Sequence, residues 1–351
     1  MRGRPGLERD GEHTMATIGQ IAAELGLSKS TVSRALRGIP SISQETIALV
    51  QEAAARLEYV PSVAAAGLST GRNHAIGVIV PSLNRWFYSS VVSGIDRTLA
   101  ELGYDVVLFD LDRSQAAGTR LFARSLLRRR VDAVIVVATV FTPEELAELA
   151  LLDMPMISVG PPVSGIRNIG VNDAAVMTAA TKHLIDLGHR AVGLVGGYDP
   201  ESLTVIGASE REHAFTRTAS AAGAVVEPTW MLSGGYRSGV AKQVVLQLYQ
   251  GLTWPTGLVC ASDEMAIGAM FAVQQAGLSV PHDVSIIGID GHEYSADYDL
   301  TTCSQDVQEQ GAAAARQVVA EVEGAPAPYA FEPAEFSLVV RGSTAPPRHS
   351  R

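Results

Sequence analysis

A short run near the amino terminus carries the side chains that a DNA-reading helix needs. After Ser28 the apolar residues recur at helical spacing and share one face. The opposite face presents Lys29, Ser30, Ser33 and Arg34. An arginine can donate two parallel hydrogen bonds to a guanine in the major groove, a contact worth roughly 1 to 3 kcal/mol of base discrimination. This polar face, with Arg34 on it, therefore suits the major groove of DNA.

A second candidate for chemistry stands where a strongly apolar run ends in a carboxylate. Residues 284–290 have the composition of a buried strand, and Asp290 is the last of them. In open α/β sheets, ligands bind beyond the carboxyl ends of the strands. A carboxylate there can accept hydrogen bonds from ligand hydroxyl groups. The alternative is a turn carboxylate in the Asp290-Gly291 pair.

Three short helices are predicted to hold Arg34 in position. The apolar faces of the three helices consist of Ile18, Ile21, Ala22 and Leu25, then Val32, Ala35 and Leu36, then Ile47, Val50, Ala54 and Leu57. Gly26 ends the first helix, and the hydroxyl groups of Ser28 and Ser43 can cap the second and third. Two helices joined by a tight glycine turn predict a helix-turn-helix unit, although small helical domains that bind no DNA share this pattern.

Beyond Arg72 the sequence alternates apolar runs with helical stretches. Runs rich in valine and isoleucine occupy residues 75–80, 104–110, 131–137, 155–160, 190–196, 257–261 and 284–290. Such runs, alternating with helices, predict parallel strands covered on both faces. The residues just after each run are therefore the candidate ligand contacts.

Length and composition indicate more than one domain. At 351 residues the chain exceeds the size of about 250 to 300 residues at which single cores usually stop growing. It contains no run of about 18 apolar residues and no signal peptide, so we expect a soluble, cytoplasmic protein that makes no membrane contact. Cys260 and Cys303 lack the spacing of a zinc site or a disulfide framework, so we expect free, partly buried thiols, no metal and no cofactor.

The distribution of charge predicts that a single helix-turn-helix unit, the head of the protein, binds DNA weakly. The chain has a net charge of −10, whereas its first 60 residues carry equal numbers of basic and acidic side chains. A reading head without net positive charge should hold DNA weakly at physiological salt. We therefore expect a homodimer that places two heads on a palindromic operator.

The run from Thr17 to Gly38, TIGQIAAELGLSKSTVSRALRG, resembles the head of the lac-repressor/galactose-repressor family nearly position by position. Other family-like runs are IGVIVP at 76–81, HLIDLGHR at 183–190, SDEMAIG at 262–268, PHDVSIIGID at 281–290, LTT at 300–302 and VRGST at 340–344. The resemblance covers about residues 15–345. It implies a small all-α helix-turn-helix head plus an α/β two-lobed periplasmic-binding-protein-like body, with the chain crossing between lobes near Asn172, Ser304 and Glu323. The function it implies is sequence-specific regulation of transcription, with repression the commoner mode, under control of a small ligand in the cleft between the lobes.

The resemblance also implies which residues contact DNA. These are Thr17, Ser28, Lys29, Ser30, Thr31, Ser33, Arg34 and Leu68. Lys29, Ser30 and Arg34 would occupy base-reading positions, with a phosphate contact as the alternative for Lys29 and a solvated helix position for Ser30. Thr31 and Ser33 would contact phosphates. Leu68 lies in a family-like hinge and would wedge a base step open from the minor groove. In the family this hinge is a short helix, and a helix of about seven residues is unstable alone in water. Gly67 costs it about 1 kcal/mol relative to alanine, so we expect the helix to fold only on DNA beside a partner subunit. The alternative is a flexible linker.

Ligand contacts follow from the resemblance as well. They are Ser82, Phe87, Tyr88, Arg211, Tyr236, Ser262, Asp290 and Gln305. Such donors, acceptors and aromatic faces suit a sugar, with a nucleoside or purine base as the alternative. Trp86 is expected to face away from the cleft, and Asp263 and Glu264 to cap a helix. Gly160 and Ser262 replace two polar residues that are common in the family, so the identity of the ligand does not transfer.

The predicted organisation has five parts. A disordered extension occupies residues 1–14, a helix-turn-helix domain 15–60, a hinge 61–73, the effector-binding and dimerisation body 74–345, and a disordered tail 346–351.

Two other classes of protein fit the sequence less well. An enzyme on this fold would be expected to show a nucleophile elbow, a phosphate-binding loop, an HExxH helix or a GxGxxG loop, and the sequence has none of them. A sugar receptor outside the cytoplasm would carry an export segment in place of the head.

Overall fold

The computed structural model describes residues 16–36, 39, 41–59, 72–111, 127, 130–197, 206–326 and 331–348. The chain divides between Asn73 and His74 into two compact units, which we call the head and the body. The predicted extension over 1–14 and most of the predicted hinge, including Leu68, lie outside the described residues. These assignments therefore stay predictions.

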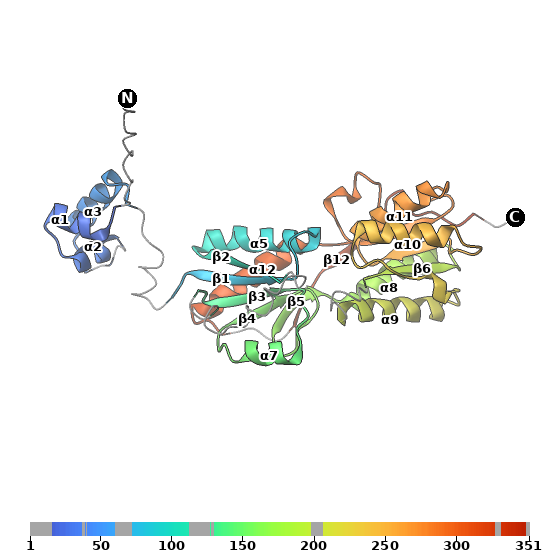
Figure 1. The fold of residues 1–351 in the computed structure, drawn as a ribbon, viewed down its shortest axis with the longest axis horizontal. Coiled ribbons are helices and arrows are strands. Elements are labelled where there is room, and N and C mark those ends of the chain that lie inside the picture. Colours follow the sequence, from blue (N-terminus) through green and yellow to red (C-terminus); the bar gives the residue numbers. More distant parts are fainter. Residues whose placement is uncertain are drawn as a thin grey trace, which may run out of the picture. The chain divides into compact units, whose positions relative to one another are not determined.

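Three helices form the head around a small apolar core (Figure 1). They are α1 (Ile18–Leu25), α2 (Lys29–Leu36) and α3 (Gln44–Arg56). The fully buried side chains at its centre are Ile21, Val32, Ala35 and Val50. The remaining predicted inner-face residues pack against this core, so the predicted helical faces are confirmed.

The predicted helix boundaries of the head are confirmed by their capping interactions. Gly26 ends α1 in the left-handed conformation, at a φ of +66°. The Ser28 hydroxyl accepts a hydrogen bond from the Thr31 backbone N–H at 3.1 Å, and Ser43 accepts one from the Thr46 N–H at 3.3 Å. Thr17, predicted as a DNA contact, forms a capping box with Gln20 at the start of α1.

The body contains two six-stranded sheets in its described residues, one in each lobe (Figure 1). Lobe 1 has the strand order β11-β5-β4-β3-β1-β2, and lobe 2 has the order β12-β10-β9-β8-β6-β7. Strand pairs are parallel except β10 with β12. The lobe-1 strands are β1 (Ala75–Val80), β2 (Asp105–Asp110), β3 (Ala133–Val137), β4 (Met156–Val159), β5 (Arg167–Val171) and β11 (Phe331–Ala334). The lobe-2 strands are β6 (Val192–Gly196), β7 (Met231–Ser233), β8 (Gly257–Cys260), β9 (Ser285–Asp290), β10 (Thr301–Gln305) and β12 (Phe336–Val339).

Helices cover both faces of each sheet. In lobe 1, α5 (Trp86–Leu102) and α12 (Val307–Val322) share a core with one face, and α7 (Pro143–Ala150) packs on the other. In lobe 2, α8 (Asp173–Asp186) and α9 (Ile206–Ala221) lie on the side opposite α10 (Ser238–Tyr249) and α11 (Asp263–Gln275) (Figure 1). Two short 3₁₀ turns, Pro228–Trp230 and Glu293–Ser295, complete the described elements. This arrangement confirms the predicted fold class.

The seven predicted strand runs correspond to β1, β2, β3, β4, β6, β8 and β9. One expectation about their environment is wrong, because β2 is not buried on both faces. Its residues are half-buried or exposed, and among the described strands β2 forms the edge of the lobe-1 sheet, with β1 as its one neighbour.

The chain crosses between the lobes three times, and the third crossing differs from the prediction. The first lies at Asn172 between β5 and α8, and the second between β10 and α12 at Asp306. The third was expected near Glu323, but it occurs at Glu335. After α12 the chain first adds β11 beside β5 in lobe 1, and only then enters lobe 2 as β12.

Two glycines let the long helices of lobe 1 touch at their backbones. A Cβ atom on Gly94 of α5 would lie 2.0 Å from the Gln308 carbonyl oxygen, and one on Gly311 of α12 would lie 2.3 Å from the Val91 carbonyl oxygen. No side chain larger than hydrogen fits at either position without separating the helices.

Several expected properties concern chemistry rather than fold. Cys260 and Cys303 are free thiols, as expected, but both are fully buried. Burial raises the pKa of the Cys303 thiol to about 12.

Within the predicted tail, Arg348 lies 3.6 Å from Asp283, and residues 349–351 fall outside the described residues. In the part of the chain that the structure describes, no helix combines the length and apolarity needed to cross a membrane.

Candidate functional site

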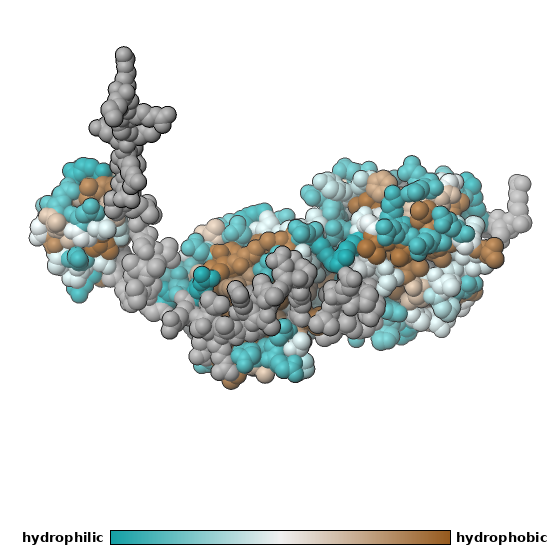
Figure 2. Space-filling model, in the orientation of Figure 1, coloured by the Kyte–Doolittle hydropathy of each residue, from teal (hydrophilic) through white to brown (hydrophobic). Residues whose placement is uncertain are grey.

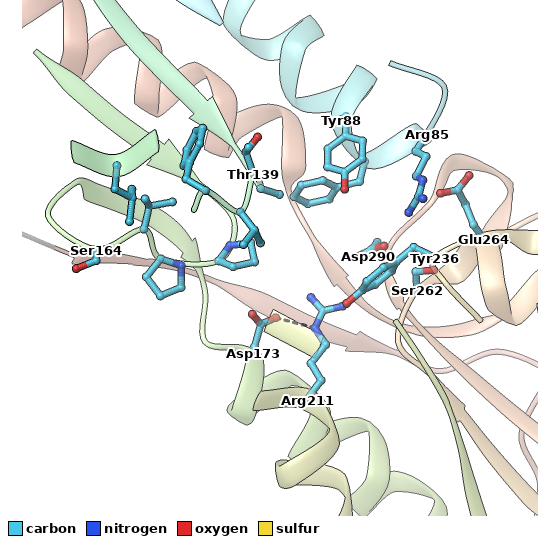
Figure 3. A pocket seen from close by; sticks show the side chains of 18 residues that line it. Arg85, Tyr88, Thr139, Ser164, Asp173, Arg211, Tyr236, Ser262, Glu264 and Asp290 are labelled. Carbon is cyan, nitrogen blue, oxygen red and sulfur yellow. Dashed lines mark hydrogen bonds and ion pairs between the residues drawn. The ribbon is translucent and has the colours of Figure 1, made fainter. Parts of the chain in front are cut away.

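A cleft in the body encloses a cavity of about 150 Å³ between the two lobes (Figure 3). Its lobe-1 wall is largely apolar and includes Phe87, Val140, Phe141, Leu146, Pro161 and Pro162. Its lobe-2 wall is polar and includes Asp173, Arg211, Tyr236, Ser262, Glu264 and Asp290. Six of the eight predicted ligand residues therefore line one cavity: Phe87, Tyr88, Arg211, Tyr236, Ser262 and Asp290.

Arg211 is held rigidly on the lobe-2 side. It extends from α9, is 9% exposed, and donates from Nε to the Asp173 carboxylate at 2.7 Å and from Nη1 to the Ala261 carbonyl at 2.5 Å. Burial opposes the charge of the guanidinium, but Asp173 and the nearby Tyr236 and Asp290 more than offset this and raise its pKa. Its side chain is therefore a positioned cation at the cavity wall, and its remaining N–H groups can act as donors there.

Asp290 ends β9 in a conformation that side chains rarely adopt, with a φ of +119°. The carboxyl is 7% exposed and accepts a hydrogen bond from the Gln305 Nε2 at 2.8 Å. Burial raises the pKa of Asp290 to about 8, although the Arg211 charge acts in the opposite direction and Asp263 adds to the rise. At neutral pH this carboxyl can hold a proton, so it can donate as well as accept a hydrogen bond.

Tyr236 reaches the cavity because its neighbours leave room for it. Its φ is +54°, and a Cβ atom on Gly197 would lie 2.0 Å from the tyrosine ring. Burial raises the pKa of Tyr236 to about 12 against the opposing effect of Arg211, so the phenol stays protonated at physiological pH. The role of Gly197 was not predicted from the sequence, because it depends on a contact with a residue 39 positions away.

Ser262 and Asp263 serve the architecture of the cleft. The Ser262 hydroxyl caps α11 by accepting from the Met265 backbone N–H at 3.3 Å. Asp263 is fully buried and accepts hydrogen bonds from Gly291, His292, Ser295 and Thr302. Burial raises its pKa to about 6, while these four bonds favour the charged form. Asp263 therefore does more than cap a helix, because it joins α11 to the segment after β9.

Glu264 corrects one sequence expectation. It was assigned to helix capping, but its side chain lines the cavity beside Arg85 (Figure 3). Burial raises the pKa of Glu264, and the Arg85 charge acts in the opposite direction. Sequence reasoning failed here because a first-turn acid on a helix normally faces solvent.

Two predicted ligand residues do not line this cavity. The Ser82 hydroxyl accepts a hydrogen bond from the Asn84 backbone N–H at 3.2 Å. Gln305 lies behind Asp290 and contacts it directly. Trp86 faces away from the cavity, as expected, and its ring packs 4.6 Å from the ring of His292.

Arg85 and Asp173 are among the lining residues that were not predicted from the sequence. A signal was available for Asp173, because it directly follows the predicted crossing at Asn172. None was available for Arg85, which stands in a polar loop before α5 with no distinguishing pattern.

In the head, the predicted DNA contacts lie in two environments. Lys29, Ser30 and Arg34 of α2 are exposed, whereas Thr31 and Ser33 are half-buried. The Ser28 hydroxyl lies 2.8 Å from those of Ser30 and Thr31, in addition to capping α2. Arg56 forms an ion pair with Glu24 that links α3 to α1. The exposed face of α2 therefore offers one arginine, one lysine and a serine, as the helical spacing predicted.

Comparisons with known proteins agree with both parts. Residues 17–62 match the model for bacterial regulatory proteins of the lacI family, and residues 181–344 match that for a periplasmic binding protein-like domain. The chain is 30% identical over 305 residues to the HTH-type transcriptional repressor PurR of Pasteurella multocida, covering 86% of this chain and 90% of that protein. It is 28% identical to catabolite control protein A of Priestia megaterium, with the same coverage. The structure of a lac repressor dimer aligns with a TM-score of 0.85 at 26% identity, covering 95% of this chain and all of that one.

A helix-turn-helix head and a two-lobed body with an enclosed cleft define the class of DNA-binding transcriptional regulators. The chain belongs to the lacI family of bacterial regulatory proteins. It is a regulator of transcription and not an enzyme.

The raised pKa of Asp290 predicts how stability depends on pH. The folded protein keeps a proton on this carboxyl that the unfolded chain releases near its ordinary pKa of 3.8. The stability from this group is therefore lost as the pH rises from about 4 to about 8. Asp290→Asn keeps the shape and an acceptor but cannot ionise. We expect its Tm to fall several degrees less than that of the parent protein between pH 5 and pH 8. Parallel Tm curves for the two proteins would contradict this.

Proposed function

We propose that this protein is a cytoplasmic repressor that binds a palindromic operator as a homodimer and is controlled by a sugar in the interlobe cleft. The observation that carries the ligand proposal is that the buried Arg211 and Asp290 lie at the same wall of the cavity. A fixed guanidinium and a carboxyl that can donate and accept suit vicinal hydroxyl groups.

The charges around the cavity favour an uncharged ligand. Arg85 and Arg211 face Asp173 and Glu264, while Asp290 can hold a proton at neutral pH. Two cations against two anions leave no excess positive charge for a phosphate group. We therefore infer a neutral sugar rather than a sugar phosphate.

A nucleoside or purine base is the second candidate for the ligand. The lobe-1 wall favours it, because Phe141, Leu146 and Pro162 offer an apolar surface that a flat base could cover. The same wall can also cover the apolar face of a sugar ring or an apolar group attached to it.

The exposed face of α2 supports operator recognition by Arg34. By resemblance, Lys29, Ser30 and Arg34 would read bases, Thr31 and Ser33 would contact phosphates, and Thr17 and Ser28 would also contact the DNA. The related lac repressor has been solved as a dimer bound to its operator and to the anti-inducer ONPF. A ligand that changes the angle between the lobes would change the spacing of two hinges in such a dimer, with a reciprocal coupling of about 1 to 3 kcal/mol.

Exposed apolar side chains on the body support a homodimer. Phe271 of α11 is 43% exposed and packs edge-on against Tyr298, which is 39% exposed, at 5.8 Å. Figure 2 shows hydrophobic residues gathered over the region of α10 and α11 and over that of α5 and β2. Apolar surface of this kind is typical of subunit interfaces.

A thermal-shift screen tests the ligand proposal. A ligand that binds only the folded state raises the Tm, so a neutral sugar at saturating concentration should raise it and sugar phosphates should not. Asp290→Ala should abolish the response, because it removes a polar group that the ligand would contact. A response to nucleosides or bases alone would overturn the sugar assignment in favour of the second candidate.

The role of Arg34 can be tested on operators selected from random DNA. Arg34→Ala should reduce the preference for the selected site over unrelated DNA by about 5-fold to 150-fold, the range of one bidentate base contact. Arg56→Ala removes an exposed arginine of the same head and serves as the matched control, with preference unchanged. Equal losses in both variants would mean that Arg34 contributes only charge.

Dimerisation through α11 is tested by charge insertion. Phe271→Glu places a carboxylate on the proposed interface, so sedimentation equilibrium should show at least a tenfold weaker association than for the parent protein, about 1.4 kcal/mol. Leu252→Glu changes an almost fully exposed leucine elsewhere and should leave association unchanged. A dimer of unchanged strength in Phe271→Glu would exclude this surface.

A further inference from the structure

Two glutamine side chains link lobe 1 to the cleft through hydrogen bonds. Gln310 lies near the start of α12, a lobe-1 helix, and is 3% exposed. Its Nε2 donates to the Gln305 Oε1 at 2.9 Å, and the Gln305 Nε2 donates to the Asp290 Oδ1 at 2.8 Å. A continuous chain of donors therefore joins a helix of one lobe to a cavity-lining carboxyl of the other.

The direction of this chain follows from the chemistry of amides. An amide has N–H donors at one end and a carbonyl acceptor at the other, whereas an ionised carboxylate can only accept. Gln305 must therefore turn its NH₂ group towards an ionised Asp290, which leaves the Gln305 oxygen in need of a donor. Gln310 supplies that donor.

The far end of the chain shows that the opposite direction is also possible. The Gln310 Oε1 is buried and has no hydrogen-bond partner among the described residues. A protonated Asp290 can donate a hydrogen bond to the Gln305 oxygen once the Gln305 amide has turned. The NH₂ group of Gln305 can then donate a hydrogen bond to the Gln310 oxygen. The ionisation of Asp290 and the orientation of both amides are therefore coupled.

We propose that Gln310 is a positioning residue for the effector, which orients Asp290 through Gln305 and couples the ionisation of Asp290 to helix α12 of lobe 1. The proposal rests on the proposed function, because it takes Asp290 as a ligand-binding group. Neither glutamine lines the cavity, so Gln310 acts only through its neighbour. A ligand hydroxyl that donates to Asp290 favours the ionised form, and thereby the donor direction seen in the structure.

Other charged and titratable groups near Asp290 come from several elements. Arg211 of α9 opposes the rise of its pKa, whereas Asp263 and Glu264 of α11 add to it. Tyr236 and Tyr88 also interact with the carboxyl and stay protonated in the range tested. The hydrogen-bond partner of Gln310 is Gln305 and not one of these groups, so substitutions at Gln310 leave the direct effects of these groups on the Asp290 pKa in place.

The test measures the Tm of the full-length protein from pH 6 to pH 9, without ligand. In Gln310→Glu the new side chain, once ionised, only accepts, so Gln305 turns its NH₂ group to it and Asp290 keeps its proton to higher pH. The fall in Tm over this range should be about 3 °C larger than in the parent protein. Gln310→Lys only donates, so it should make the fall smaller by a similar amount. The introduced carboxyl and amine also titrate in this buried position and change the fall in the same directions, so each variant is compared with its own Asp290→Asn counterpart, and the difference between the two measures the relay.

Background substitutions separate the relay from a direct effect of charge. In an Asp290→Asn background only the titration of the introduced group remains, so the changes should shrink, and changes of unaltered size would overturn the proposal. In a Gln305→Met background the changes should shrink to the same remainder, and changes of unaltered size there would show that the charges act through space and also overturn the proposal. Unaltered pH profiles in both Gln310 variants would reduce Gln310 to a packing residue and also overturn the proposal.

Val318→Ala is the matched control, because Val318 is a fully buried residue of the same helix whose apolar side chain forms no hydrogen bond. It should lower the Tm equally at every pH. The measurement uses no ligand, so its outcome is distinct from that of the thermal-shift screen. Failure of the screen removes the effector assignment, whereas failure of the pH profiles removes the relay.

Discussion

The buried carboxylate of Asp263 is the interaction on which the cleft depends. Its two oxygens accept four hydrogen bonds, two of them from the backbone N–H groups that follow Asp290. A buried charge without such partners would be strongly unfavourable, so the bonds and the burial require each other. Gly288 of β9 belongs to the same constraint, because a Cβ atom there would lie 2.0 Å from the Asp263 Oδ1. The end of β9, and with it Asp290, is thereby fixed against α11.

Around this anchor the cavity is built from groups that oppose one another. Arg211 stays charged in a buried position because Asp173 pairs with it, and Asp290 remains close to that cation while holding a proton at neutral pH. The polar wall therefore offers donors and acceptors without a large excess of charge. The opposite wall, from lobe 1, is largely apolar, although Arg85 adds a charge to it.

Three crossings of the chain connect the two lobes covalently. Each lobe is assembled from segments that are distant in the sequence, and the crossings at Asn172, Asp306 and Glu335 are the covalent links between the lobes. Asp306 caps α12, whose backbone touches α5 at Gly94 and Gly311. The second crossing is therefore joined directly to two lobe-1 helices that pack backbone against backbone.

By itself, the sequence determined the features that depend on local periodicity and on short motifs. The helices of the head, their caps at Ser28 and Ser43, the seven strand runs and the family all follow from neighbouring residues. Only the tertiary structure decided what depends on residues distant in the chain. It moved Glu264 from a helix cap to the cavity wall, placed Gln305 behind Asp290, located the third crossing at Glu335 and exposed β2 at a sheet edge. The physical reason is that burial, charge pairing and hydrogen-bond direction are set by contacts across the fold, which no local pattern contains.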